Sequence, residues 1–284
     1  MAGGCETAGM VEPLSSSRLG LVPYAEATAL QDQLAEARRR GEVADTLLLL
    51  EHPPVLTKGR RTDPRELGMG EDWYRSQGID VLPTDRGGRV TYHGPGQLVA
   101  YPIVDLTALG EGRTADVRAW VELLERVMIA ALADHGVPAQ VFSGLTGVWT
   151  AGRPPIPEGA PGPQGTMVAA CDPALAAAPR EARKIGSIGI HVSRGVTTHG
   201  LAVNVSNDLQ PFEWIVPCGI DGCRMTSVTR ELGAEQEMDS FAASLTNRFA
   251  EVYERLPVPV SASELAERAG GGSSLPIGEA GALR

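Results

Sequence analysis

The chain has 284 residues, 43% of them apolar, and a formal net charge of −10 at pH 7. This length and composition predict a single large domain with a substantial core, and the acidic balance argues against a nucleic-acid partner. The longest apolar stretches, 47–50 and 127–133, are too short to span a bilayer, and residues 1–10 lack the features of a secretory signal. We therefore expect a soluble cytoplasmic protein that has no membrane partner.

The first predicted element is a helix over residues 24–40. Apolar or alanine residues recur at the spacing of a helical stripe, and Gly41 follows as a stop signal. Residues 46–50 form a short apolar run, which is typical of a buried strand. The stripe of the helix consists of positions 27, 30, 34 and 37.

Two short strands are predicted next, at 90–92 and 98–104. The pair Gly87-Gly88 precedes the first strand, and His93-Gly94-Pro95-Gly96 separates the two. Glycine and proline at this spacing predict either a hairpin or a sharply folded loop.

The clearest predicted helix covers residues 114–135. Thr114 can cap its beginning, and Gly136-Val137-Pro138 ends it. A last amphipathic helix is expected over 239–256. The stripe of the 114–135 helix consists of Val117, Trp120, Leu124, Val127 and Ala131, and further strands are expected at 139–142, 147–150, 185–192 and 201–205.

The remaining segments are poorly suited to a packed core. Residues 151–181 are rich in proline, glycine and alanine, so we expect an insertion that loops out rather than joining a sheet. Residues 1–18 are expected to be a flexible extension and residues 259–284 a disordered tail. The folded domain is then predicted to cover 19–258.

Cys218 is the cysteine with the most suggestive context, since it lies between Pro217 and Gly219. Lys184 precedes it by 34 positions (218 − 184). A neighbouring ammonium favours the nucleophilic thiolate and can move protons, which suits acyl transfer through a thioester. The sequence alone leaves open whether the two side chains meet. The other three cysteines, Cys5, Cys171 and Cys223, have no comparable context, and no CxxC pair indicates a metal site.

Several long motifs, in one order, resemble the lipoyl(octanoyl) transferase family. The most specific is RGGRVTYHGPGQLVAY at 86–101, followed by KIGSIGIHVSRGVTTHGLAVNVSNDL at 184–209 and PFEWIVPCGI at 211–220. EHPPVLTKGRR at 51–61 and GVW at 147–149 complete the set, and the resemblance spans roughly residues 20–258. In most family members, the segment between the GVW motif and the KIG motif is shorter than residues 151–181 are here.

The resemblance implies an α/β fold with a mixed sheet flanked by helices, like the catalytic domain of biotin and lipoate protein ligases. It implies transfer of an octanoyl group from acyl carrier protein to a lysine of a lipoyl domain, the first step of endogenous lipoate synthesis. The acceptors would be lipoyl domains of 2-oxoacid dehydrogenase E2 subunits and the glycine cleavage H protein. No ATP is expected, because the incoming thioester is already activated. No metal is expected, because no pair of His or Cys residues has ligand spacing, and no other cofactor is implied.

The resemblance also assigns roles to residues. Cys218 becomes the nucleophile and Lys184 its partner, with Arg183 as a competing candidate that makes a poor base because guanidinium stays protonated. His93 or His199 remains an alternative base, since histidine commonly activates cysteine. The implied substrate-binding residues are Arg86, Gly87, Gly88, Arg89, Val90, Thr91, Tyr92 and His93, then Ser187, Ile188 and Gly189, then Gly200, Leu201 and Ala202.

A basic segment offers a docking hypothesis for the acyl carrier protein. Lys58, Arg60, Arg61 and Arg65 against Asp63 give +3 within eight residues, and a local patch can outweigh the total charge because salt screens distant charges. A solvated basic loop is the simpler interpretation.

Three alternative functions remain open at this point. An ATP-dependent lipoate or biotin ligase would not need Cys218. An amidotransferase would move octanoyl between lipoyl domains by the same chemistry. A protein that only binds lipoyl domains would form no acyl-enzyme.

Overall fold

A computed structural model describes residues 12–108, 116–156, 159–163, 166–170, 180–220 and 222–270. Within these ranges, the strands form one nine-stranded mixed sheet and one three-stranded sheet. The large sheet consists, in spatial order, of β12 (Leu256–Pro259), β1 (Pro13–Leu21), β2 (Thr46–Glu51), β6 (Gln97–Ile103), β11 (Val196–Asn204), β10 (Lys184–Ser193), β8 (Leu145–Thr150), β7 (Ala139–Ser143) and β9 (Ala169–Ala170). The small sheet consists of β4 (Asp80–Pro83), β3 (Val55–Lys58) and β5 (Val90–His93).

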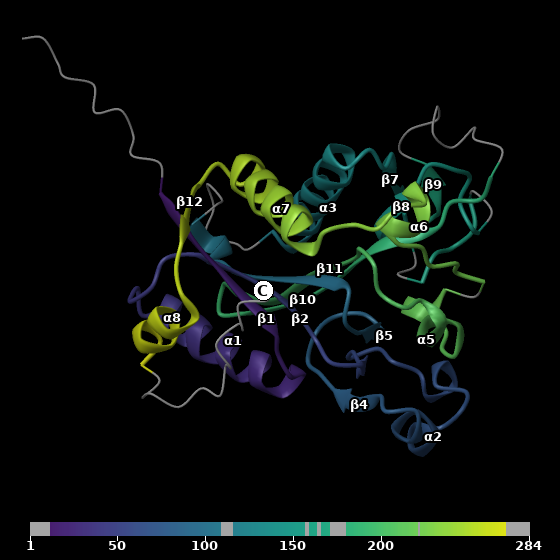
Figure 1. Cartoon of the computed structure of the whole chain (residues 1–284), viewed down its shortest axis with the longest axis horizontal. Coiled ribbons are helices and arrows are strands. Elements are labelled where there is room, and N and C mark those ends of the chain that lie inside the picture. Colours follow the sequence, from purple (N-terminus) through teal and green to yellow (C-terminus); the bar gives the residue numbers. More distant parts are fainter. Residues whose placement is uncertain are drawn as a thin grey trace, which may run out of the picture.

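Helices cover both faces of the large sheet (Figure 1). On one face lie α3 (Val117–Asp134) and α7 (Met238–Val252), and on the other α1 (Tyr24–Arg39) and α8 (Ala262–Arg268). Strand β6 shows why two cores form: successive side chains point to opposite faces, so Leu98 packs in the core of α3 and Val99 in that of α1. The expected α/β class with a flanked mixed sheet is confirmed.

Shorter helical segments complete the described chain, and none of its helices is long and apolar enough to cross a membrane. They are η1 (Pro64–Glu66), α2 (Glu71–Ser76), η2 (Leu106–Ala108), α5 (Gln210–Glu213), η3 (Pro217–Gly219) and α6 (Val228–Leu232).

The long helices were predicted more accurately than their ends. The helix expected over 24–40 is α1, and all four stripe positions are buried. The cap predicted for α3 was wrong: the Asp116 carboxylate accepts the backbone N–H groups of Arg118 and Ala119, both at 3.0 Å, whereas residue 114 lies outside the described ranges. Val117 is exposed in the first turn and does not join the buried stripe.

The hairpin proposed for 90–104 is wrong, and the sharply folded loop is what forms. Strand β5 pairs with β3 in the small sheet, whereas β6 pairs with β2 and β11 in the large one. A turn in which the Gln97 N–H donates to the Gly94 carbonyl carries the chain from one sheet to the other. Residues 86–101 therefore connect the two sheets.

Both predicted flexible ends contain ordered structure. Strand β1 lies between β2 and β12, so the expectation of a flexible segment is wrong for residues 13–18. Its serines at 15, 16 and 17 are buried, and this polar run hid the strand from a search for apolar patterns. In the predicted tail, Pro259 ends strand β12, which pairs with β1, and α8 buries Leu265 against α1 and the sheet.

Part of the predicted insertion also joins the sheet. Within residues 151–181, Ala169 and Ala170 form the edge strand β9 on β7. Unlike proline, alanine has a backbone N–H that can donate to a neighbouring strand, so this short stretch can pair with a sheet. Val168 beside it is buried against Trp149 and its neighbours.

Candidate active site

A cavity lies where β5 of the small sheet faces β10 and β11 of the large sheet. Of the residues predicted for the site, Cys218 and Lys184 line it together with most of the substrate-binding set. That set comprises Arg86, Gly88, Arg89, Thr91, His93, Ser187, Ile188, Gly189, Gly200, Leu201 and Ala202.

Three predicted substrate-binding residues, Gly87, Val90 and Tyr92, do not line the cavity. Strand alternation explains two of them: Thr91 and His93 face the cavity, so Val90 and Tyr92 face the opposite core around Leu56. The Gly87 backbone N–H instead donates to the Ile190 carbonyl at 2.8 Å. This bond holds the 86–89 loop against β10.

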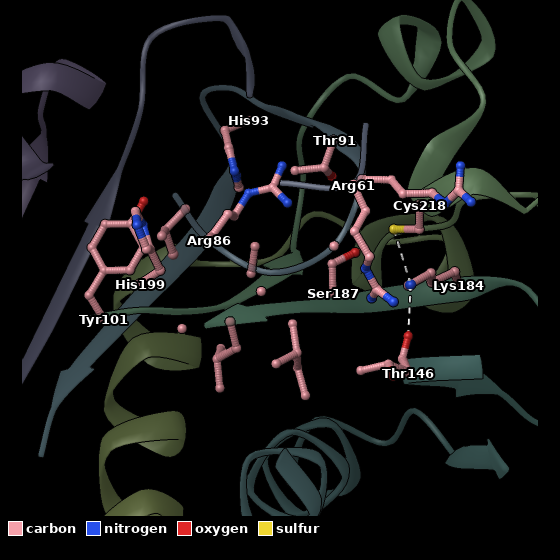
Figure 2. A pocket seen from close by; sticks show the side chains of 18 of the residues that line it. Arg61, Arg86, Thr91, His93, Tyr101, Thr146, Lys184, Ser187, His199 and Cys218 are labelled. Carbon is pink, nitrogen blue, oxygen red and sulfur yellow. Dashed lines mark hydrogen bonds between the residues drawn. The ribbon is translucent and has the colours of Figure 1, made fainter. Parts of the chain in front are cut away.

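Lys184 and Cys218 meet at one end of the cavity, as Figure 2 shows. The ammonium Nζ of Lys184 donates to Cys218 Sγ at 3.3 Å and to the Thr146 carbonyl at 2.9 Å. Lys184 is buried at the start of β10, and its Nζ lies 5.4 Å from the centroid of the Trp149 ring. A buried ammonium in contact with a thiol is an arrangement that supports nucleophilic catalysis.

The backbone at Cys218 is strained. In η3, Cys218 has φ +58° and ψ 13°, a left-handed conformation that residues other than glycine rarely adopt. Such strain costs on the order of 1–3 kcal/mol and concentrates at functional sites. Gly219 follows with φ +69°, and a Cβ at this position would overlap the Arg89 side chain. The turn thus presents the thiol to the cavity.

Arg86 crosses the cavity as a buried guanidinium. It donates to the carbonyl and the hydroxyl of Thr57, both at 2.7 Å, and to the Gly87 carbonyl at 3.1 Å. No carboxylate of the described chain lies within ion-pair distance of it. Burial therefore lowers the pKa of the Arg86 guanidinium from its ordinary value.

The histidines near the cavity are held by partners other than Cys218. His52 donates from Nδ1 to the Val22 carbonyl at 2.6 Å and accepts the Tyr101 hydroxyl at Nε2, 2.8 Å away, and burial lowers its pKa to about 4. His93 bonds Gln97 at 2.7 Å, and burial lowers its pKa far below the ordinary value.

His199 lies at the other end of the cavity (Figure 2), where its Nε2 is 2.7 Å from a carboxylate oxygen of Asp85. Within the described chain, the side chain that hydrogen-bonds Cys218 is Lys184. Neither His93 nor His199 does so. Arg183, the competing candidate, forms an ion pair with Glu231 at 2.7 Å and does not line the cavity. Among the described residues, no group of three or more His, Cys, Asp or Glu side chains is placed to hold a metal ion.

Several lining residues were not assigned to the site from the sequence. Tyr101 ends the 86–101 motif and Thr146 immediately precedes the 147–149 motif, so the positions of the motifs are the signal that could have identified both. The sequence assigns Arg61 to the basic docking segment and not to the cavity. The full set not assigned is Tyr24, Arg61, Val99, Tyr101, Thr146, Pro163 and, as a lining residue, His199.

Comparison with known proteins gives a consistent result. Residues 23–250 match the family model of the lipoyl protein ligase A/B catalytic domain. The chain is 40% identical over 246 residues to an octanoyltransferase of Acidobacterium capsulatum, covering 84% of this chain and 90% of that protein. An octanoyltransferase of Solibacter usitatus is 40% identical over 237 residues, covering 84% and 91%.

Solved structures show the same fold at low identity. A lipoate-protein ligase A bound with ATP superposes with a TM-score of 0.60 at 17% identity, covering 92% of each chain. A putative lipoate protein ligase from T. acidophilum superposes with a TM-score of 0.59 at 15% identity, covering 92% of this chain and 93% of that one.

Proposed function

Because the chain belongs to the octanoyltransferases of the lipoyl protein ligase A/B catalytic domain family, we propose that it acts through an octanoyl-Cys218 thioester. The donor is octanoyl-acyl carrier protein, and the acceptor is a lysine of a lipoyl domain. The observation that supports this mechanism is the 3.3 Å contact between Lys184 Nζ and Cys218 Sγ in the wall of the cavity. The comparisons establish octanoyl transfer in lipoate biosynthesis, and the residue roles and the donor are our proposal.

The first half-reaction uses the ammonium form of Lys184. The Cys218 thiolate attacks the thioester carbonyl, and the bond to the carrier sulfur breaks as the tetrahedral intermediate collapses. Lys184 gives its proton to the departing carrier thiolate. The products are the octanoyl-enzyme, the free carrier thiol and a neutral Lys184.

The second half-reaction restores the starting state. The amine of the acceptor lysine attacks the octanoyl-Cys218 carbonyl, and neutral Lys184 accepts a proton from that amine. The bond between carbonyl carbon and sulfur breaks, leaving the octanoyl amide and the Cys218 thiolate beside the Lys184 ammonium. No ATP is consumed, because both acyl compounds are activated thioesters.

The cavity wall formed by β10 and β11 would bind the acyl chain. Ser187, Ile188 and Gly189 on β10 lie opposite Ala202, Leu201 and Gly200 on β11, so the two segments form a continuous wall that starts near Lys184. Each buried methylene contributes about 0.8 kcal/mol. A fully buried octanoyl chain would therefore gain roughly 6 kcal/mol relative to water.

The basic segment is smaller than its sequence suggests. Lys58 pairs with Glu71 at 2.5 Å and Arg65 with Asp63 at 2.6 Å, which leaves Arg60 and Arg61 exposed and without an ion pair in the described chain. Arg61 also lines the cavity. These two arginines are the cations best placed to receive an acidic carrier.

Charge reversal tests this docking role. Arg60→Glu with Arg61→Glu should raise KM for octanoyl-acyl carrier protein about tenfold, while a small octanoyl thioester reacts as before. Arg65→Glu is the matched control on a paired arginine. Equal losses with both donors would show that the two arginines act on chemistry or folding instead of docking.

Intact-protein mass spectrometry tests the mechanism. The protein is incubated with octanoyl-acyl carrier protein without ATP, as wild type, Cys218→Ala and Lys184→Ala. We expect an octanoyl adduct on wild type, none on Cys218→Ala and slow formation on Lys184→Ala. An unmodified wild type that lipoylates an acceptor only with ATP and free acid would indicate a ligase. Transfer from an octanoylated lipoyl domain but not from the carrier would indicate an amidotransferase. We place the reaction in the cytoplasm, where the thiol stays reduced.

A further inference from the structure

One peptide group in β8 lies between a carboxylate and the cavity ammonium. The carbonyl of Thr146 accepts the Lys184 Nζ–H at 2.9 Å. The N–H of the same peptide group, which belongs to Gly147, donates to Glu125 Oε1 at 2.9 Å. Glu125 and Lys184 are thus joined through a single peptide plane.

The sheet leaves this peptide group available. The ladder between β8 and β10 is irregular between Lys184 and Gly186 and has its last pair at Val148, and the ladder between β7 and β8 shifts register between Gln140 and Phe142. Residues 146 and 147 fall in these interruptions. Buried backbone groups need hydrogen-bond partners. Here the Glu125 carboxylate and the Lys184 ammonium are the partners that neighbouring strands would otherwise supply.

Gly147 is required for this arrangement. Its φ is +109°, and a Cβ here would lie 2.9 Å from Lys184 Cε and 3.2 Å from Nζ. The backbone of β8 therefore passes directly against the end of the lysine side chain. A small rotation of the Thr146–Gly147 peptide plane would move the carbonyl that fixes the ammonium beside Cys218.

Glu125 is the group that resists such a rotation. It lies on α3, a helix packed on the sheet, and is half buried. Burial raises the pKa of its carboxyl, and the Gly147 N–H and the charge of Lys184 oppose that rise. Hydrogen bonds in a chain polarise one another, and a carboxylate acceptor makes the bond stronger than a neutral one.

We propose that Glu125 is a positioning residue for the Cys218–Lys184 pair, acting through the Thr146–Gly147 peptide group. The carboxylate holds the N–H end of the peptide, so the carbonyl end stays aimed at Lys184 Nζ. Lys184 is thereby kept within contact of Cys218 instead of turning toward the open cavity. This inference rests on the proposed function of the pair.

Two substitutions separate positioning from general folding. Glu125→Gln keeps an oxygen that can accept the Gly147 N–H, whereas Glu125→Leu has a similar size and keeps none. Glu122→Gln, one turn earlier on α3 and exposed in an ion pair with Arg118, is the matched control. Thermal unfolding of each variant reports whether the fold survives.

The readout is the rate at which Cys218 is alkylated by iodoacetamide at pH 7, followed by peptide mass spectrometry. This rate needs no acyl donor, so it stays informative even if wild type forms no acyl-enzyme and the proposed function fails. We expect Glu125→Leu to slow alkylation at least tenfold, Glu125→Gln to stay within about threefold of wild type, and Glu122→Gln to match wild type.

The same ranking is expected for single-turnover acylation by a small octanoyl thioester. A folded Glu125→Leu protein that alkylates at the wild-type rate would overturn the proposal. So would equal losses in Glu125→Gln and Glu125→Leu, because the amide would then fail to replace the carboxylate as an acceptor. If Glu125→Leu does not fold, Glu125→Ala, which also lacks an acceptor for the Gly147 N–H, takes its place: a tenfold loss supports the proposal and a wild-type rate overturns it.

Discussion

Replacing Lys184 with methionine should slow the reaction of Cys218 with iodoacetamide by about 100-fold at pH 7. Methionine has a similar length and suits the buried site against Trp149, so only the charge and the donors are lost. Two unit charges 3.3 Å apart attract by about 5 kcal/mol at an effective dielectric constant near 20. Cys218 is partly exposed, and water screens part of this attraction. About half of it, roughly 2.7 kcal/mol, corresponds to the 100-fold change because 1.36 kcal/mol is tenfold.

The assay follows the modified Cys218 peptide by mass spectrometry over time. Resolving the peptides matters because burial raises the pKa of the neighbouring Cys223 thiol to about 12, so that thiol should react far more slowly. Lys58→Met is the matched control, since Lys58 pairs with Glu71 outside the cavity. The thermal midpoint of Lys184→Met is measured beside the rate to show that the variant folds, because the substitution also removes the donor to the Thr146 carbonyl. Alkylation within twofold of wild type would refute the idea that this ammonium stabilises the thiolate.

Two further predictions concern stability. In the unfolded chain His52 has its ordinary pKa of 6.5, whereas burial lowers its pKa in the folded protein to about 4. The free energy of unfolding should therefore fall by about 3 kcal/mol from this group as the pH falls from 6.5 to 4, because the unfolded chain takes up the proton first. His52→Gln should remove this slope, measured by urea unfolding at pH 7 and 4.5; an unchanged slope would assign it elsewhere. Gly219→Ala should cost at least 1 kcal/mol more than Gly222→Ala, since both glycines have positive φ but only the first would force a Cβ into Arg89. Equal midpoints in thermal unfolding would contradict the overlap.

The sequence predicted elements whose signals are local. The buried stripes of α1 and α3 recur at helical spacing, and the apolar run of β2 is continuous, so each could be read from neighbouring residues. Strand β1 could not, because Ser15, Ser16 and Ser17 are buried although none of them is apolar, and the strand is recognised only by its pairing with β2 and β12. The partners of a strand are set by topology, which a local pattern does not contain.

The same limit explains the hairpin that does not form. The turn at Gly94 was placed correctly, yet a turn between two strands is compatible with pairing to each other or to different sheets. The outcome depends on the partner strands, which are β3 for β5 and both β2 and β11 for β6. The outcome matters for the site, because separating β5 from β6 opens the space in which His93 and Val99 line one cavity.

Glu125 could not be identified as part of the site from the sequence. Nothing distinguishes it locally from Glu122 on the same helix, since both are polar residues in an amphipathic pattern. Its distinction comes from three features outside its own helix. The interrupted β8 ladder leaves an N–H without a strand partner, Gly147 brings the backbone against Lys184, and the strained turn at Cys218 presents the thiol from the other side. A motif can show which residues meet at such a site. The groups that position those residues, such as the Glu125 carboxylate, are the ones that accept hydrogen bonds from backbone N–H groups without a strand partner. Only the register of the strands shows where such bonds are needed.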